Sequence, residues 1–179
     1  VNLDCDMSVI QKAMDEIGIC FLMAPRHHMA MRHVAASRSE LGTRTIFNIL
    51  GPLANPALVK KQLVGVFSEA WVEPMAHVLK GLGSERAWVV HGSDGLDEIT
   101  TTGVTKVAAL DKGSVSTFTI HPEDANLELV SPKQLKGGLP RQNAIALENL
   151  LRGEKGPYRD IVLFNSAAAF IIAGKVNNL

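Results

Sequence analysis

The sequence predicts an α/β fold in which a mixed, mostly parallel sheet is flanked by helices. The first observation is a strand–helix–strand pattern at residues 63–67, 72–82 and 87–91, which is typical of parallel strands joined by a right-handed crossover. The second is a series of short alternating segments after residue 100, and the third is helical periodicity on both sides of the strands. Because 46% of the 179 residues are hydrophobic and 20% are charged, the chain can bury a core of its own. We expect a single α/β domain over residues 1–179.

The first third of the chain is expected to be helical. Apolar residues at helical spacing predict a helix over residues 7–17, followed by Gly18 as its C-cap, and a second helix over residues 28–41, closed by Gly42. Residues 45–59 carry no charge and contain two proline turns. We therefore expect a turn of helix that passes into a tight, buried loop.

The last third is expected to combine an antiparallel meander with three helices. Alternation and turn residues predict strands over residues 100–103, 106–110 and 114–121. Helices are predicted from residue 131, over residues 141–151 and over residues 160–173. The third of these helices is almost entirely apolar and should be central. Its apolar run, interrupted by Asn165 and Ser166, is shorter than the roughly 20 residues needed to span a bilayer.

Charge and cysteine content exclude several classes of protein. Lys and Arg number 18, and Asp and Glu also number 18, so the formal net charge is zero. A neutral chain argues against a nucleic-acid arm or a membrane-surface module. The two cysteines, Cys5 and Cys20, have neither a paired nor a zinc-ligand spacing, which favours a reducing compartment over a disulfide scaffold. We expect a cytoplasmic protein.

A local positive patch nevertheless lies near the N-terminal end. Residues 24–44 contain four arginines and a single acid, Glu40. On the predicted helix Arg38 shares a face with Met31, Val34 and Leu41, so its guanidinium should point toward an apolar neighbourhood and require an anion. The planar fork of arginine matches a carboxylate with two parallel hydrogen bonds. Arg38 is therefore a candidate ligand for a substrate carboxylate, and the alternative is a structural ion pair.

A second candidate site follows the second predicted strand. Residues 91–98 read HGSDGLDE, with three carboxylates within five residues. Magnesium takes oxygen ligands and is often held by one or two carboxylates, with water and substrate phosphate completing the octahedron. Adjacent Asp97 and Glu98 are therefore candidate magnesium ligands, and the alternative is a solvated turn. The spacing is not that of an EF-hand, and the chain contains no zinc-protease, Walker or dinucleotide-binding motif.

Four stretches together resemble the anthranilate phosphoribosyltransferase family. They are FLMAPR, RTIFNILGPLANP, HGSDGLDE and GEKG, at residues 21–26, 44–56, 91–98 and 153–156. The resemblance covers nearly the whole chain and implies a nucleoside phosphorylase/phosphoribosyltransferase-type catalytic domain. It also implies that a helical domain with a glycine-rich pyrophosphate loop lies upstream of Val1, so the 179-residue chain alone is expected to be inactive.

The resemblance implies an activity and roles for particular residues. The family transfers phosphoribosyl from phosphoribosyl pyrophosphate to anthranilate in tryptophan biosynthesis, with Mg2+, as a homodimer. By motif, Arg38 resembles the arginine that binds the anthranilate carboxylate, and Asp97 and Glu98 resemble the magnesium ligands. Ala24 and His28 fall where the family lines its anthranilate channel, as does Pro52. No residue of this chain is expected to act as a general base, and catalysis would rest on positioning and electrostatics.

Three alternatives remain open at this point. A pyrimidine nucleoside phosphorylase shares the fold implied by the resemblance, but the Asp97–Glu98 pair argues against it. A non-enzymatic nucleic-acid-binding relative should have a strongly basic surface, which the zero net charge disfavours. The third alternative is a stable scaffold domain with no activity of its own.

Overall fold

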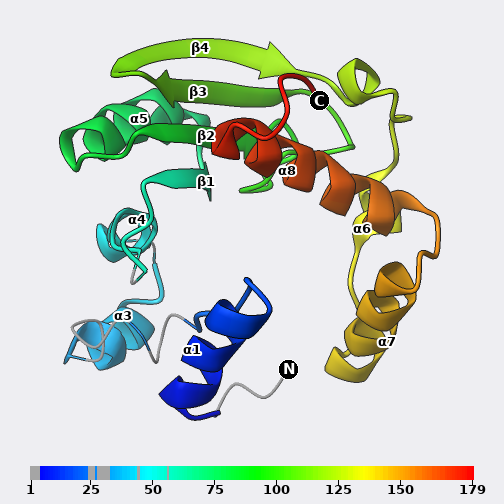
Figure 1. The fold of residues 1–179 in the computed structure, drawn as a ribbon, viewed down its shortest axis with the longest axis horizontal. Coiled ribbons are helices and arrows are strands. Elements are labelled where there is room, and N and C mark those ends of the chain that lie inside the picture. Colours follow the sequence, from blue (N-terminus) through cyan, green and yellow to red (C-terminus); the bar gives the residue numbers. More distant parts are fainter. Residues whose placement is uncertain (1–4, 24–26, 28–32, 44, 56) are drawn as a thin grey trace. The chain divides into compact units, whose positions relative to one another are not determined.

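The structure, a computed structural model, describes residues 5–23, 27, 33–43, 45–55 and 57–179 (Figure 1). The chain divides into two compact units, Val1–Leu58 and Val59–Leu179, which are described separately. A single domain over residues 1–179 therefore stays a prediction.

The first unit contains the helices expected near the N-terminal end. Helix α1 (Met7–Glu16) begins after Asp6, whose side chain accepts a hydrogen bond from the Ser8 N–H at 2.8 Å. This cap satisfies one of the amide groups that a helix leaves without a partner at its start. The helix predicted over residues 28–41 is present as α3 (Ala35–Leu41), and residues 28–32 lie outside the described part.

The prediction of a buried loop over residues 45–59 is wrong for the described residues of this unit. Helix α4 (Phe47–Leu53) forms there as expected, but none of its residues is buried. Ile46 is 65% exposed and Leu58 is 81% exposed. An uncharged segment can be buried at low cost, but it becomes buried only where another part of the protein covers it.

The second unit is built on a four-stranded sheet with the order β1-β2-β3-β4 (Figure 1). Its strands are β1 (Lys61–Gly65), β2 (Arg86–Gly92), β3 (Thr105–Asp111) and β4 (Ser114–Ile120). The pair β1 and β2 is parallel, and the other two pairs are antiparallel. The mixed α/β class is confirmed, but the sheet is not mostly parallel. Parallel neighbours need a crossover connection, and in this sheet helix α5 (Val72–Gly81) forms one between β1 and β2. The strands β3 and β4 are instead joined by a tight turn, in which Lys112 and Gly113 have positive φ, so they pair antiparallel.

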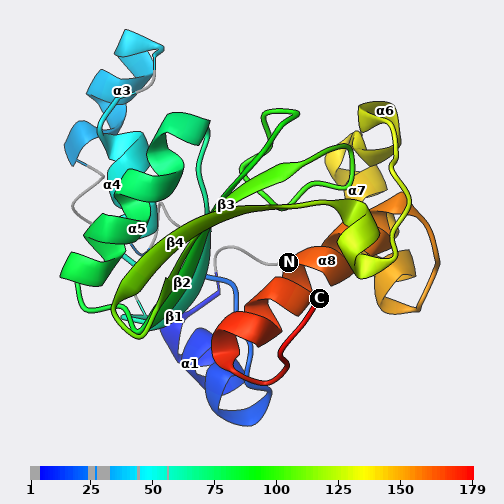
Figure 2. The ribbon, with the colours of Figure 1, turned by 90° about the horizontal axis from the view of Figure 1, so that it is seen from above.

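Two helices cover opposite faces of this sheet (Figure 2). Helix α5 packs on β2, β3 and β4 through four buried residues, Val72, Met75, Ala76 and Leu79. Helix α8 (Pro157–Ala173) packs on β1 and β2, where Phe164 and Ala168 join a buried cluster that includes Val90. One face of α8 is buried as predicted, but Phe170 is 55% exposed, so the helix is not central all round.

The strand predicted over residues 100–103 is also wrong. These residues form a bend, in which the N–H of Thr100 donates to Oγ1 of Thr105 at 3.0 Å. Both threonines are fully buried. Their β-branched side chains indicated a strand, but side-chain hydrogen bonds to the backbone replace the ladder of a sheet here.

The remaining helices agree with the predictions. Helix α6 (Pro132–Leu135) follows Ser131, and helix α7 (Pro140–Leu151) follows it after a short connection. Within the described part of the chain, no helix combines the length and the apolar character needed to cross a membrane.

Candidate metal-binding loop

The acidic loop, residues 93–98, begins where β2 ends. This is the C-terminal edge of the parallel pair β1 and β2, the position at which ligands commonly bind in α/β sheets. The loop is closed by two backbone hydrogen bonds, from the Gly92 N–H to the Leu96 carbonyl and from the Gly95 N–H to the Gly92 carbonyl, each 2.9 Å long. Gly95 has a φ of 90°, which a side chain would strain.

Asp94 holds this loop from within. Its Oδ2 accepts hydrogen bonds from the hydroxyls of Thr100, at 2.7 Å, and Thr102, and its Oδ1 accepts one from the Leu96 N–H at 3.1 Å. Burial by itself would raise the pKa of Asp94, but the hydrogen bonds from Thr102 and Thr100 outweigh burial and lower it. Asp94 is therefore engaged in the fold of the loop, and Asp97 and Glu98 are the carboxylates left for a ligand.

We expect Asp94→Asn to lower the free energy of unfolding by about 1–2 kcal/mol at pH 7, because hydrogen bonds to an ionised but exposed carboxylate are lost. Since folding depresses the pKa of Asp94, its contribution is present above the unfolded pKa of about 3.9 and is lost as the pH falls through the folded value. Urea unfolding between pH 7 and pH 3 measures this. The difference between wild type and variant should shrink at the acid end.

The control for this measurement is Asp111→Asn, which breaks a surface ion pair with Arg86 of 2.9 Å. Exposed pairs contribute at most about 1 kcal/mol, so the control should change stability less. A difference for Asp94→Asn that stays constant with pH would contradict the role of its charge.

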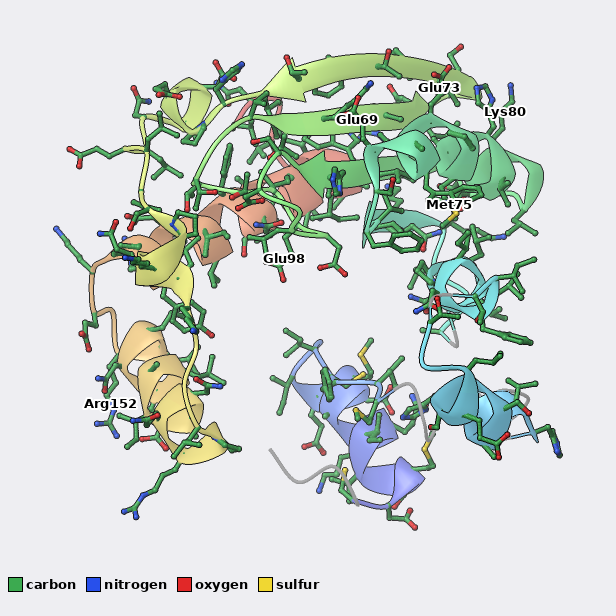
Figure 3. The ribbon with its side chains drawn as sticks, turned by 180° about the vertical axis from the view of Figure 1, so that it is seen from behind. Glu69, Glu73, Met75, Lys80, Glu98 and Arg152 are labelled. Atoms are coloured by element: carbon green, nitrogen blue, oxygen red, sulfur yellow. The ribbon has the colours of Figure 1, made fainter. Side chains whose placement is uncertain are left out.

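Asp97 and Glu98 line a cavity of about 420 Å³ between the end of the sheet and α8. Glu98 lies in the loop beside this helix (Figure 3). Although the Glu98 residue is exposed overall, partial burial of its carboxyl raises its pKa, and the adjacent charge of Asp97 raises it further. The two carboxylates therefore repel each other when both are ionised, and a bound cation would relieve that repulsion.

The donor set at this loop fits magnesium. The described residues include no cluster of three or more His, Cys, Asp or Glu side chains able to hold a metal. Asp97 and Glu98 offer carboxylate oxygens, as a hard cation requires, but they cannot form a complete cage. Such a site suits an ion whose remaining ligands are water and substrate phosphate.

Gly65 at the end of β1 lies against the same loop. A Cβ on this residue would overlap the carbonyl oxygen of Asp97, so only glycine allows the loop to approach the strand this closely. This role of Gly65 was not predicted from the sequence. A glycine inside a predicted strand is the signal that could have indicated it, because such glycines often mark close approach of another backbone.

Asn165 on α8 is a second residue of the site whose role was not predicted from the sequence. It lines the cavity together with Asp97 and Glu98 and bonds to the backbone just after them. The available signal was an amide side chain within the mostly apolar run of residues 161–173. A half-buried amide needs hydrogen-bond partners, and here they come from the loop.

Arg38 belongs to α3 in the first unit, and its side chain lies outside the described part of the chain. The structure brings Asp97 and Glu98 together but does not relate Arg38 to them. Of the expected channel residues, Ala24 and His28 also lie outside the described residues, and Pro52 lies within α4.

Another cavity, of about 340 Å³, lies between α6, α7 and the start of α8. Its lining includes Glu154, Lys155 and Gly156, which belong to one of the four stretches quoted above. None of the predicted ligand residues lines it, so the acidic loop remains the candidate site.

The second unit is an α/β domain with helices on both faces of a mixed sheet. Its candidate site is the loop at the ends of β1 and β2, where two adjacent carboxylates line a cavity. Residues 1–179 match the family model described as "Glycosyl transferase family, a/b domain". The chain belongs to this family.

Curated relatives match this chain over its whole length. The anthranilate phosphoribosyltransferases of Brucella suis biovar 1 and Rhodospirillum rubrum are each 59% identical to it over all 179 residues. The chain spans about half the length of these relatives, 52% in both cases. The resemblance inferred from the four stretches is thereby confirmed.

Solved structures of anthranilate phosphoribosyltransferases have the same fold as this chain. Anthranilate phosphoribosyltransferase from Thermus thermophilus superposes with a TM-score of 0.86 at 44% identity, over 93% of this chain and 49% of that one. The enzyme from Saccharomyces cerevisiae in complex with 4-fluoroanthranilate gives 0.86 at 34% identity, over 98% and 53%. The Saccharomyces cerevisiae enzyme in complex with PRPP and Mg gives 0.83 at 32% identity, over 97% and 50%.

Proposed function

We propose that the full-length protein carrying this chain transfers phosphoribosyl from phosphoribosyl pyrophosphate to anthranilate. The products are N-(5-phosphoribosyl)anthranilate and pyrophosphate, a step of tryptophan biosynthesis. The observation that carries the proposal is the 59% identity, over the whole chain, to relatives named for this reaction. The paired carboxylates at the strand-end loop supply independent support from the geometry.

In the proposed reaction the amine nitrogen of anthranilate bonds to C1 of the ribose while the bond from C1 to pyrophosphate breaks, and the nitrogen then loses a proton to water. Asp97 and Glu98 hold Mg2+, which when bound offsets the charge that grows on the departing pyrophosphate. Arg38 binds the anthranilate carboxylate and orients the amine. This chain supplies no general base, so its contribution is positioning and electrostatic stabilisation.

The proposal extends to cofactor, assembly and location. Mg2+ as the cofactor is supported by the oxygen-only donor set and by the Saccharomyces cerevisiae structure with PRPP and Mg. The full-length protein is proposed to be a cytoplasmic homodimer with no nucleic-acid or membrane partner. The resemblance supports the dimer, the cysteine pattern supports the location, and the zero net charge supports the absence of such partners.

The test is to incubate the full-length protein with phosphoribosyl pyrophosphate, anthranilate and Mg2+ and to measure the formation of N-(5-phosphoribosyl)anthranilate. We expect turnover with these substrates and none with phosphate and a pyrimidine nucleoside. The 179-residue chain alone should give no product, because the family's pyrophosphate loop is not among its residues. Turnover of the nucleoside instead of anthranilate would overturn the proposal.

A further inference from the structure

We propose that Asn165 is a positioning residue, which fixes the backbone that carries Asp97 and Glu98 and so sets the affinity of the loop for its metal. This inference rests on the proposed magnesium site. It assigns a role to a residue of α8 that is 66 positions in sequence from Ile99, the residue that follows the loop.

The amide of Asn165 bonds to both backbone polar groups of Ile99, the residue that follows the loop. Its Oδ1 accepts from the Ile99 N–H at 3.0 Å, and its Nδ2 donates to the Ile99 carbonyl at 2.8 Å. Nδ2 also donates to the Ile161 carbonyl, one turn earlier in α8, at 2.9 Å. The third bond fixes the orientation of the amide, so the two bonds to Ile99 form a rigid clamp.

The clamp acts on the segment that holds the carboxylates. The Ile99 N–H belongs to the peptide that joins Glu98 to Ile99, so the bond from Asn165 restrains the backbone of Glu98 directly. The Ile99 side chain is fully buried in a cluster that includes Phe164, a neighbour of Asn165 on α8. This packing fixes Ile99, the residue to which the amide of Asn165 bonds. Backbone and side chain therefore anchor the end of the acidic loop to α8.

The beginning of the same segment contacts β1. The Asp97 carbonyl lies so close to Gly65 of β1 that no side chain would fit between them. The pair Asp97 and Glu98 is thus confined between β1 and α8 before any ligand is present. Confinement matters here because two adjacent carboxylates repel each other and would otherwise turn apart.

A loop held in this way does not have to reorganise when the metal arrives. Residues that orient metal ligands without touching the ion typically contribute about 10- to 100-fold to metal affinity or activity. Removal of the clamp should therefore weaken metal binding while both carboxylates remain present.

The decisive variant is Asn165→Ser in the full-length protein. A serine hydroxyl is too short to reach Ile99 but can bond to the carbonyl one turn earlier, as Ser166 does to Val162 at 2.7 Å in the same helix. The variant therefore keeps the bond within α8 and loses both bonds of the clamp. Asn165→Ala, which loses the clamp and also the bond within α8, is the second variant if the serine variant does not accumulate as folded protein.

Mn2+ binding, followed by electron paramagnetic resonance with phosphoribosyl pyrophosphate present, is the first measurement. We expect the dissociation constant for Mn2+ to rise by about 10- to 100-fold. The second measurement is turnover against Mg2+ concentration. Most of the lost turnover should return at high Mg2+, which would not happen if Asn165 only stabilised the fold.

Two control variants isolate the clamp. Asn143→Ser removes an amide that clamps Gly138 in the same two-point manner, at 2.7 and 3.1 Å, away from the acidic loop. Ile172→Val removes a buried methyl group from α8 and so lowers stability while the clamp stays in place. Both should bind Mn2+ like the wild type.

An unchanged Mn2+ dissociation constant for Asn165→Ser, with lowered thermal stability, would overturn this inference. The variant with both Asp97→Asn and Glu98→Gln separates that outcome from a failure of the site. If that variant also binds Mn2+ normally, the proposed metal site is wrong; if it does not, only the role of Asn165 is wrong.

Discussion

Replacement of Asp97 by Asn together with Glu98 by Gln in the full-length protein is expected to lower turnover by at least about 100-fold, because the departing pyrophosphate loses the metal that offsets its charge. The two amides keep the size of the side chains. Because the two carboxylate charges are lost, most of the dependence of turnover on Mg2+ should also disappear. Turnover is measured against Mg2+ concentration for wild type and variant side by side.

Stability should not follow turnover in this variant. Burial and the neighbouring Asp97 raise the pKa of Glu98, which means that its ionised form destabilises the folded state above that pKa. Removal of both charges should therefore leave the melting temperature at neutral pH unchanged or slightly higher. The effect on stability should vanish at a pH where both carboxyls are protonated.

A matched control removes two charges from another adjacent acidic pair, by Glu123→Gln with Asp124→Asn in the 3-10 helix Pro122–Ala125. This control should keep its turnover and its Mg2+ dependence. If the Asp97 and Glu98 variant behaves like the control, the acidic loop is a solvated turn and the metal assignment fails.

Replacement of Arg38 by Ala is expected to raise the KM for anthranilate by about 10- to 100-fold, the equivalent of one lost charged hydrogen-bonding partner. The KM for phosphoribosyl pyrophosphate should change by less than about threefold, because only anthranilate carries the carboxylate that the guanidinium fork matches. Steady-state kinetics with each substrate varied in turn measures both constants.

Arg152→Ala, at the residue that follows α7, is the control, since this arginine is exposed and contacts Glu148 at 3.8 Å (Figure 3). It should alter neither KM. Equal increases in both constants for Arg38→Ala, together with lower stability, would favour the structural ion pair over the carboxylate ligand.

Much of the second unit could be predicted because its signals are local. The succession of β1, α5 and β2 was expected from the strand–helix–strand pattern at residues 63–67, 72–82 and 87–91, and the hairpin between β3 and β4 from alternation and turn residues. The acidic loop was also expected at the end of β2. Each of these features depends on residues that are close in sequence, so spacing alone contains the information.

Two predictions were wrong because they were based on the composition of a segment, and contacts with the rest of the protein gave that segment a different structure. Residues 100–103 were assigned to a strand on composition, but hydrogen bonds involving Thr100 and Thr105 hold a bend instead. Residues 45–59 were assigned to the interior because they lack charge, yet Ile46 and Leu58 are exposed in the first unit. Composition indicates whether a segment favours a strand or a buried position, but the segment adopts it only where neighbouring segments pair with it or cover it.

The fold class, the family and a loop whose adjacent carboxylates suit a hard cation could all be predicted from the order of the amino acids. Which carboxylates are left for a ligand, and which residues hold them, depends on contacts between segments that are distant in the chain. Asp94 is engaged by Thr100 and Thr102, while Gly65 and Asn165 confine the remaining pair. The reason is physical. These contacts join residues on β1, the loop and α8, and a packed core brings together positions that no local periodicity relates.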